Sequence, residues 1–225
     1  MHIYLASLTQ LFEEGSNPEN ALAMRKYMRD QFEFLGIKSP QRKLLFKQFL
    51  AKSGLPDLAE LAAICRDLWA LPAREYQYCG MDLLDKMQRK VTPEFVSLIE
   101  YMIVTKSWWD TVDLLASHAV GSMFTRFPGE RDAQISRWRV SENMWLRRTT
   151  LLFQMLYKDK TDVDLLFALI EENQESTEFF IQKAIGWALR QYSKTDATAV
   201  LDFVNSHTLA PLSEREALKW LNRNQ

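Results

Sequence analysis

The stretch that decides the fold is NMWLRRTTLLFQMLYKDKTD, residues 143–162. When it is shifted by 35 residues it lies over EFFIQKAIGWALRQYSKTDA, residues 178–197. The shift places apolar positions on apolar positions, and it places Arg148 on Lys183. A repeat of this length with helical spacing is typical of an α-solenoid, because each helix pair needs a neighbour to bury its apolar face.

Helical spacing continues through the rest of the chain. Residues 57–69, DLAELAAICRDLW, place their apolar side chains on one helical stripe. A cap residue followed by proline predicts helix starts at three places, Asn17-Pro18, Ser39-Pro40 and Thr92-Pro93. Ser141-Glu142 and Asp162 indicate two further starts. Because no alternating strand or Asn-Gly hairpin is present, the sequence predicts an all-α protein of about a dozen helices.

Composition agrees with a helical protein that has a well-formed core. Of the 225 residues, 47% are hydrophobic and 25% are charged, while Gly and Pro contribute only 7 each. Scarce Gly and Pro beside abundant Leu, Ala and Glu favour helix. We therefore predict one domain over residues 1–225, an α-solenoid of HEAT-like helix-pair repeats.

Several function classes find no support in the sequence. Cys65 and Cys79 give no disulfide framework, and His2, His118 and His207 lie in no metal-ligand motif. The N-terminal segment lacks the basic start of a signal peptide, and no apolar run reaches membrane-spanning length. We therefore expect a cytoplasmic protein without a metal, a small-molecule cofactor or a membrane partner. With no oligomerisation signal, we expect a monomer.

Charge is unevenly distributed along the chain. The net charge is −1, yet residues 25–52 contain eight lysines and arginines against Asp30 and Glu33. A local basic patch on a near-neutral protein is a possible footprint for a polyanion. From charge alone, two solvated helix faces explain this stretch better than a polyanion-binding patch does. A binding role for the patch therefore needs a second observation.

The 35-residue phase relates polar positions in the rest of the chain. It makes four residues equivalent on successive inner helices: Tyr78, Asp113, Arg148 and Lys183. Trp109 lies four residues before Asp113 and Trp187 four after Lys183, so each shares a helix face with its neighbour. Because charges are costly in a helical core, we expect these residues to line a concave, basic face.

Five segments resemble a known family, the bacterial DNA alkylation repair family of HEAT-like, AlkD-type DNA glycosylases. They are VTKSWWDTVD, WLRRTTLLFQMLYK, EFFIQKAIGWALRQYSKT, LAPLSEREAL and FLGIKSPQRK. The resemblance covers about residues 2–223, and the SWWD and FIQKAIGW segments are its specific parts. It departs mildly where Lys38-Ser39 replaces a common Gln-Thr pair and Lys43 a common arginine.

The resemblance implies an activity and a set of site residues. It implies a monofunctional enzyme that excises cationic alkylpurines, chiefly 3-methyladenine and 7-methylguanine, from duplex DNA without full base flipping. The family's catalytic tryptophan and aspartate match Trp109 and Asp113, and a second tryptophan matches Trp187. A phosphate-gripping arginine matches Arg148, and a tyrosine beside the lesion matches Tyr27.

These residue types suit the chemistry. A purine alkylated at N3 or N7 is a good leaving group, so the remaining barrier is positive charge developing on the sugar. A carboxylate about 4 Å away offers up to ~4 kcal/mol at an effective dielectric near 20, roughly a thousandfold in rate. We assign this stabilisation, and the orientation of water, to Asp113. Trp109 and Trp187 would press against the sugar, worth roughly 0.5–2 kcal/mol each.

The basic patch then acquires a role as a phosphate-binding surface. The residues expected to contact DNA are Arg25, Lys26, Tyr27, Arg29, Lys38, Ser39, Arg42, Lys43 and Lys47 in the N-terminal part, with Arg148 and Lys183. Lys183 has two interpretations. It could form a Schiff base with an abasic sugar, or serve as a phosphate or acid partner; the monofunctional family favours the second.

The remaining aromatic and acidic residues have plainer interpretations. We expect Trp108 to pack in the core and Asp110 to act as a cap or supporting acid. Trp69, Trp138, Trp145 and Trp220 are also expected to pack. An alternative function is a noncatalytic HEAT scaffold that binds DNA or protein on its concave face. Such a scaffold would not need Trp109, Asp113, Arg148 and Trp187 in register.

Overall fold

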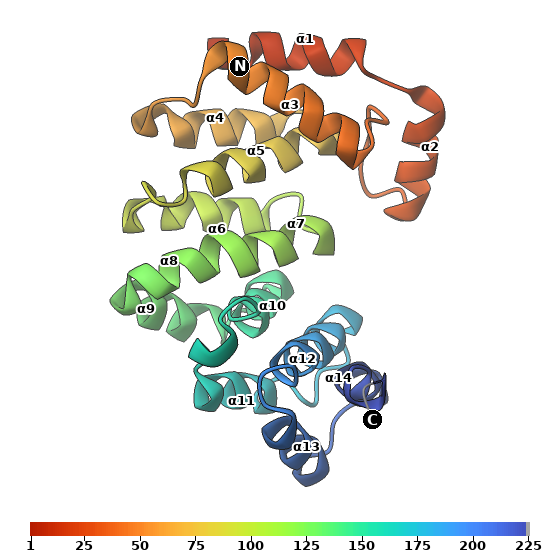
Figure 1. Cartoon of the computed structure of the whole chain (residues 1–225), viewed down its shortest axis with the longest axis vertical. Helices are drawn as coiled ribbons and strands as arrows, with labels where there is room; N and C mark the ends of the chain where they lie inside the picture. The colour runs from red at the N-terminus through yellow and green to blue at the C-terminus, as the bar shows by residue number, and fades with distance from the viewer. Residues whose placement is uncertain (224–225) are drawn as a thin grey trace. The chain divides into compact units, whose positions relative to one another are not determined.

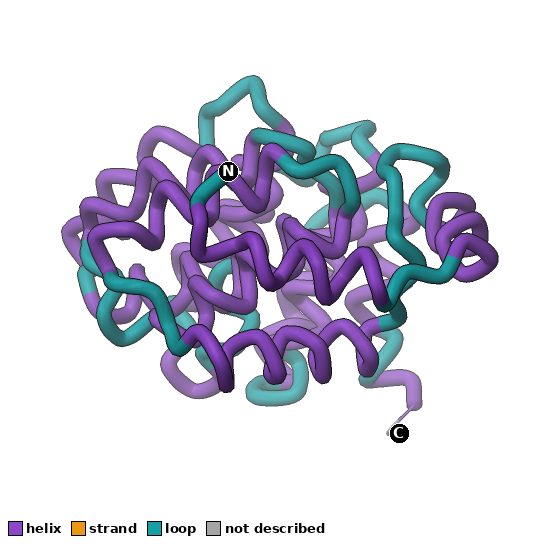
Figure 2. The backbone as a smooth tube through the Cα atoms, turned by 90° about the horizontal axis from the view of Figure 1, so that it is seen from above, coloured by secondary structure: helices purple, strands orange, loops and turns teal. Residues whose placement is uncertain are grey.

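The structure is a computed structural model, and it describes residues 1–223. Over this range the backbone forms helices and loops but no strand, as the tube in Figure 2 shows. An isolated parallel bridge joins Glu33 to Ala73. The expectation of an all-α chain is therefore confirmed for the described residues. Within that range, no helix is both long and apolar enough to cross a membrane.

The helices gather into two compact units, Met1–Lys106 and a second unit that begins at Ser107. The prediction of a single domain over residues 1–225 stays a prediction. Within each unit the helices pack in stacked pairs, for example α4 on α5 and α12 on α14. This stacking agrees with the α-solenoid predicted from the repeat.

The first unit begins with a short 3₁₀ turn, Ile3–Leu5, and a second such turn, Pro93–Phe95, leads into its last helix. Its six α-helices are α1 (Ala6–Glu14), α2 (Pro18–Tyr27), α3 (Ser39–Ser53), α4 (Leu58–Ala70), α5 (Arg74–Met87) and α6 (Val96–Val104). The apolar stripe predicted at residues 57–69 falls on α4, where Leu61, Cys65, Leu68 and Trp69 are fully buried. Burial of this stripe against α5 and α6 forms part of the core of the first unit.

The second unit contains the other eight α-helices of the described chain (Figure 1). They are α7 (Trp109–Leu114), α8 (Gly121–Arg126), α9 (Pro128–Trp138), α10 (Met144–Leu152), α11 (Val163–Glu171), α12 (Phe179–Tyr192), α13 (Ala197–Ser206) and α14 (Pro211–Leu218). Short 3₁₀ turns occupy Lys158–Lys160 and Leu221–Arg223. Helix α10 packs on both α7 and α12, and this three-helix group carries the candidate site.

The predicted helix starts are largely confirmed. Asn17 and Asp162 cap α2 and α11, because their side chains accept the backbone N–H of Asn20 and Leu165. The start predicted at Ser141-Glu142 lies two residues later, since Asn143 is the residue that caps α10. Ser39 is also not a cap but the first residue of α3. Both shifts are of the size expected for helix ends read from sequence.

A π-helical segment, Leu115–Val120, connects α7 to α8. The backbone stays in the right-handed helical region on both sides of it, so α7 and α8 form one helix interrupted by a wider turn. π-Helical turns occur frequently at functional sites, because they redirect the side chains around them. Here the segment begins two residues after Asp113, and it contains His118.

Candidate active site

Asp113 and Arg148 form a two-point ion pair between α7 and α10. Arg148 Nε donates to Asp113 Oδ1 and Nη2 donates to Oδ2, both at 2.7 Å. This parallel arrangement is the strongest form of an arginine–carboxylate contact. The sequence phase of 35 residues therefore brings the two side chains together, as predicted.

Arg148 itself is enclosed by the second unit. Its side chain is 1% exposed, while that of Asp113 is 18% exposed. The Arg148 Nη1 atom donates to the backbone carbonyl of Phe180, at the beginning of α12. The acid is thus the member of the pair that reaches the surface, and the guanidinium behind it fixes the direction in which its oxygens point.

Two opposing influences act on the charge of Asp113. Burial raises the pKa of the carboxyl above its ordinary value, as does the negative charge of Asp110, while the charge and hydrogen bonds of Arg148 lower it. The net direction is upward. The geometry fits the ionised form, because each oxygen accepts a charge-assisted N–H bond from the guanidinium at 2.7 Å.

The two adjacent tryptophans take different positions. Trp108 packs its ring against Trp145 and Phe180, with centroid separations of 5.9 and 5.0 Å. Trp108 thus packs on neighbouring rings as expected, but it is half-buried and not enclosed in the core. Trp109 begins α7 and is half-buried, one helical turn before Asp113. Asp110 lies in the first turn of α7, where a negative charge is favourable to the helix dipole.

Trp187 on α12 has three cationic groups near its ring. The guanidinium carbons of Arg148 and Arg190 lie 5.5 and 5.9 Å from the indole centroid, and Lys183 Nζ lies 6.0 Å away. All three distances are in the range of cation–π attraction. Arg148 therefore connects Asp113 to Trp187 physically, since it contacts both.

Lys183 has a partner that the sequence did not indicate. Its Nζ donates to Glu216 Oε1 at 2.8 Å, and Arg190 Nη1 donates to Glu216 Oε2 at 2.8 Å. Lys183 thus has an acid partner, as one of its expected roles required, and the acid is the buried Glu216 on α14. Neither Arg190 nor Glu216 follows from the 35-residue phase.

The N-terminal residues expected to bind DNA lie in the first unit. The Tyr27 side chain is 71% exposed at the end of α2, and Lys38, Ser39, Lys43 and Lys47 are exposed at or on α3. Lys43 and Lys47 line a groove between α3 and α5. Lys86, Asp82 and Asp85 complete its polar lining.

Arg42 does not fit its expected role as a phosphate contact. Its side chain is 7% exposed, forms an ion pair with Asp82 and lies 5.3 Å from the ring centre of Tyr78. The helical phase explains the difference: Arg42 lies on the inner face of α3, while Lys43 and Lys47 lie on the outer face. Arg148 does not fit its expected role as a phosphate contact either, because its side chain is buried and paired with Asp113.

The turn before α3 is held by a fully buried acid. The Glu75 carboxylate accepts three consecutive backbone N–H groups, from residues 35–37, at 3.1, 2.9 and 3.0 Å. Gly36 has a φ of +84°, and a Cβ there would lie 1.9 Å from the Asn17 carbonyl oxygen. These constraints fix the backbone immediately before the exposed Lys38 and Ser39.

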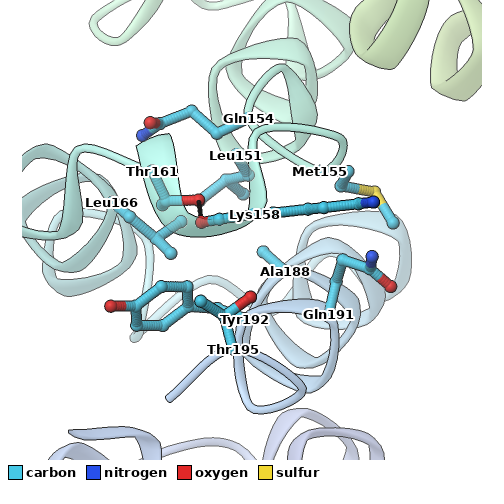
Figure 3. Close-up of a pocket in the computed structure, with 10 residues that line it drawn as sticks. All are labelled: Leu151, Gln154, Met155, Lys158, Thr161, Leu166, Ala188, Gln191, Tyr192 and Thr195. Atoms are coloured by element: carbon cyan, nitrogen blue, oxygen red, sulfur yellow. Dashed lines mark hydrogen bonds between the residues drawn. The ribbon is translucent and has the colours of Figure 1, made fainter.

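A separate small pocket lies farther along α10 and α12 (Figure 3). Its lining includes Leu151 and Gln191, one turn after Arg148 and Trp187 respectively, and Lys158 extends across it toward Met155. None of the candidate catalytic side chains lines this pocket. Within residues 1–223, no three His, Cys, Asp or Glu side chains are grouped so that they could hold a metal ion.

The protein is a stack of packed helices. Its candidate site contains the Asp113–Arg148 ion pair, with Trp109 one helical turn before Asp113 and Trp187 beside Arg148. The chain matches the family model of the DNA alkylation repair enzyme over residues 8–221, and it belongs to this family. A solved structure described as a predicted DNA alkylation repair enzyme from Enterococcus faecalis is similar to it, with a TM-score of 0.85 and 38% sequence identity. The match covers 92% of this chain and 96% of that chain. No curated protein matches the chain.

Proposed function

We propose that this protein is a monofunctional DNA glycosylase that hydrolyses the N-glycosidic bond of cationic alkylpurines in duplex DNA. 3-Methyladenine and 7-methylguanine are the substrates expected. The observation that carries the proposal is the Asp113–Arg148 pair. It holds a partly exposed carboxylate in a fixed orientation through Arg148, whose guanidinium also lies beside the ring of Trp187.

The substrate's own chemistry explains why so few groups are needed. Alkylation at N3 or N7 gives the purine a positive charge, so the base leaves as a neutral molecule without a general acid. The sugar becomes electron-poor as the bond to the base lengthens. Water then adds to C1′ and loses a proton, which leaves an abasic site and the free base.

Asp113 stabilises the developing sugar cation and orients the attacking water. Its two oxygens are held by Arg148, so little reorganisation accompanies the reaction. A carboxylate about 4 Å from the cation supplies up to ~4 kcal/mol at an effective dielectric near 20. Trp109 and Trp187 lie against the deoxyribose and stabilise the same charge through their π faces.

Arg148 acts as the positioning residue of Asp113 in this proposal. Its enclosed guanidinium spends three N–H groups on Asp113 and the Phe180 carbonyl. Phosphate contacts are assigned to the exposed side chains Lys38, Ser39, Lys43 and Lys47 and to the partly exposed Lys183, with Tyr27 beside the lesion. Because these contacts grip backbone rather than base edges, the alkylpurine reacts without being fully flipped out.

Release of 7-methylguanine from methylated duplex DNA tests the function. We expect wild-type protein to release it far above the spontaneous rate, and Asp113→Asn to lose release while it still binds the duplex. No release above the spontaneous rate would reject the enzyme. Borohydride trapping tests the monofunctional assignment, since a covalent protein–DNA crosslink would identify Lys183 as a Schiff-base nucleophile instead.

A further inference from the structure

One face of α12 carries two cations with a tryptophan between them. Lys183, Trp187 and Arg190 occupy positions i, i+4 and i+7, so their side chains leave the helix on the same side. Lys183 Nζ and Arg190 Cζ lie 6.0 and 5.9 Å from the Trp187 ring centre. The indole is therefore flanked along the helix axis by positive charge from both directions.

Glu216 joins the two cations from the opposite helix, α14. Its Oε1 accepts from Lys183 and its Oε2 accepts from Arg190, each at 2.8 Å. The Glu216 side chain is 7% exposed, while Lys183 and Arg190 are 24% and 28% exposed. A third cation, Lys219 Nζ, lies 3.8 Å from Oε1. These charges lower the pKa of Glu216, chiefly through the hydrogen bond of Lys183.

Close packing of α12 on α14 fixes the position of this acid. A Cβ on Gly186 would lie 2.5 Å from the Glu216 Cβ and 2.7 Å from the Ser213 carbonyl oxygen. Only glycine leaves the space that α14 occupies. The Ser213 hydroxyl also donates to the Gln182 carbonyl at 2.9 Å, which ties the two helices together one turn away. Glu216 is thereby placed directly against the residue that precedes Trp187.

The charge around Trp187 would be unfavourable to a sugar cation without this acid. Arg148, Lys183 and Arg190 all lie within 6.0 Å of the ring centre. Asp113 compensates Arg148, and Glu216 compensates one of the two positive charges that it pairs with on α12. A positive charge that forms beside the indole is repelled by every cation left uncompensated.

We propose that Glu216 is a positioning residue of the repair site, which holds Lys183 and Arg190 beside Trp187 and offsets their charge where the sugar cation develops. The proposal rests on the glycosylase function proposed above. It assigns Glu216 two effects of opposite sign, because the phosphates of DNA favour positive charge at this place while the reaction centre does not.

Glu216→Gln separates these effects, since it keeps the side-chain shape and removes the charge. DNA binding should stay as tight as in wild type or become tighter, because the local positive charge rises. Base release from the bound complex should slow about tenfold, the effect of one uncompensated charge at roughly 6 Å in an intermediate dielectric. If Glu216 only stabilised the fold, Glu216→Gln would weaken DNA binding and slow base release together.

The experiment measures single-turnover release of 7-methylguanine and the Kd for the same methylated duplex. The matched control is Glu214→Gln, which removes the same charge from an exposed position on the same helix and should change neither quantity. An unchanged release rate in Glu216→Gln, or a parallel loss of affinity and rate, would overturn the inference. Failure of the wild type to release base would instead reject the function itself.

A second variant keeps the test decisive if Glu216→Gln folds poorly, which thermal melting by circular dichroism reports. Lys183→Met/Glu216→Gln removes one charge of each sign, and replacing an ion pair in this way is often neutral for stability. We expect its release rate to recover toward wild type, because the net charge of the cluster returns to its wild-type value. A double variant no faster than Glu216→Gln, or slower than wild type by tenfold or more, would contradict the proposed charge effect.

Discussion

Two clusters of the second unit each pair an acid with cationic side chains, but they differ in which charge is the more exposed. In the first, the acid Asp113 is 18% exposed and the arginine behind it is 1% exposed. In the second, the acid Glu216 is 7% exposed and its cations Lys183 and Arg190 are 24% and 28% exposed. Each cluster thus presents one sign of charge to solvent and keeps the other within the protein.

This difference indicates what each cluster can do. An exposed carboxylate that is oriented from behind can meet a positive charge, whereas exposed cations held by a buried acid can meet phosphate. A sugar cation in DNA lies between two phosphates, so both signs are needed within a short distance. Trp187 contacts cations of both clusters, which places it at the junction.

The largest expected effect comes from removing the exposed acid of the first cluster. Asp113→Asn should slow release of 7-methylguanine about a thousandfold, because the developing sugar cation loses its counter-charge. It should also lower the melting temperature, since a buried Arg148 is left without an anion. The release assay is therefore run below that temperature.

Asp110→Asn is the matched control for this substitution, because it removes the same charge from the preceding turn of α7. We expect its release rate to stay within a few-fold of wild type, since the proposed mechanism gives Asp110 no contact with the sugar and its negative charge acts on the reaction only through Asp113. If both variants lost release rate equally, the reaction would depend on the total negative charge of α7 and not on the oriented carboxylate of Asp113.

The next effect concerns one cation of each cluster. Arg148→Lys should slow release about thirtyfold, because an ammonium cannot make the two parallel bonds that orient Asp113. Lys183→Arg, the reverse change in the second cluster, should alter the rate less than about twofold. Single-turnover rates of both variants test the comparison, and similar losses would contradict the contrast drawn between the clusters.

Acidity should affect the two clusters in a fixed order. Burial raises the pKa of Asp113, so enzyme-dependent release should begin to fall at a higher pH than for an ordinary aspartate, near 3.9. Below the pKa of Asp113 the rate should drop about tenfold per pH unit. The spontaneous acid-catalysed release is subtracted at each pH.

Glu216 behaves oppositely, because its neighbouring cations lower its pKa. A carboxyl with a lowered pKa contributes stability that is present above its unfolded value, roughly 4.3, and is lost as the pH falls through the folded value. Activity should therefore be lost before the contribution of Glu216 to stability. Thermal melts and release rates over the same pH series check this order, and coincident loss would contradict it.

A smaller effect is expected at the junction of the two clusters. Trp187→Leu should slow release about fivefold, because an apolar side chain is kept while about 1 kcal/mol of cation–π stabilisation is lost. Trp187→Phe should lose less, since it retains an aromatic face. A leucine variant as fast as wild type would show that Trp187 only packs.

The smallest effects concern phosphate contacts in the first unit. Lys43→Ala and Lys47→Ala should each weaken binding of duplex DNA about two- to threefold and reduce the salt slope by about one. Arg42→Ala should leave the slope unchanged and lower the melting temperature instead, because Arg42 is paired with Asp82 inside the unit. Fluorescence anisotropy at several salt concentrations measures the slopes.

Much of the molecule follows from local sequence rules. Helical spacing and cap residues predicted α2, α4 and α11, because a helix is stabilised by contacts within a few residues and by one apolar face. The 35-residue phase predicted that Asp113 and Arg148 would meet, because equivalent positions of stacked repeats are neighbours. The one-turn spacing from Asp113 and the family resemblance separated the two tryptophans, and the site role of Trp109 stays a prediction.

The remaining features depend on which helix faces pack together, and the tertiary structure alone decided them. The sequence placed Arg42 and Arg148 among DNA contacts, yet packing enclosed both and gave each an acid partner. Glu216 is distant in sequence from Lys183, and only the close approach of α14 at Gly186 brings them together. Sequence thus determined the residue types and their helical phase, while long-range packing decided which charges face the solvent, since burial depends on neighbours that local periodicity does not encode.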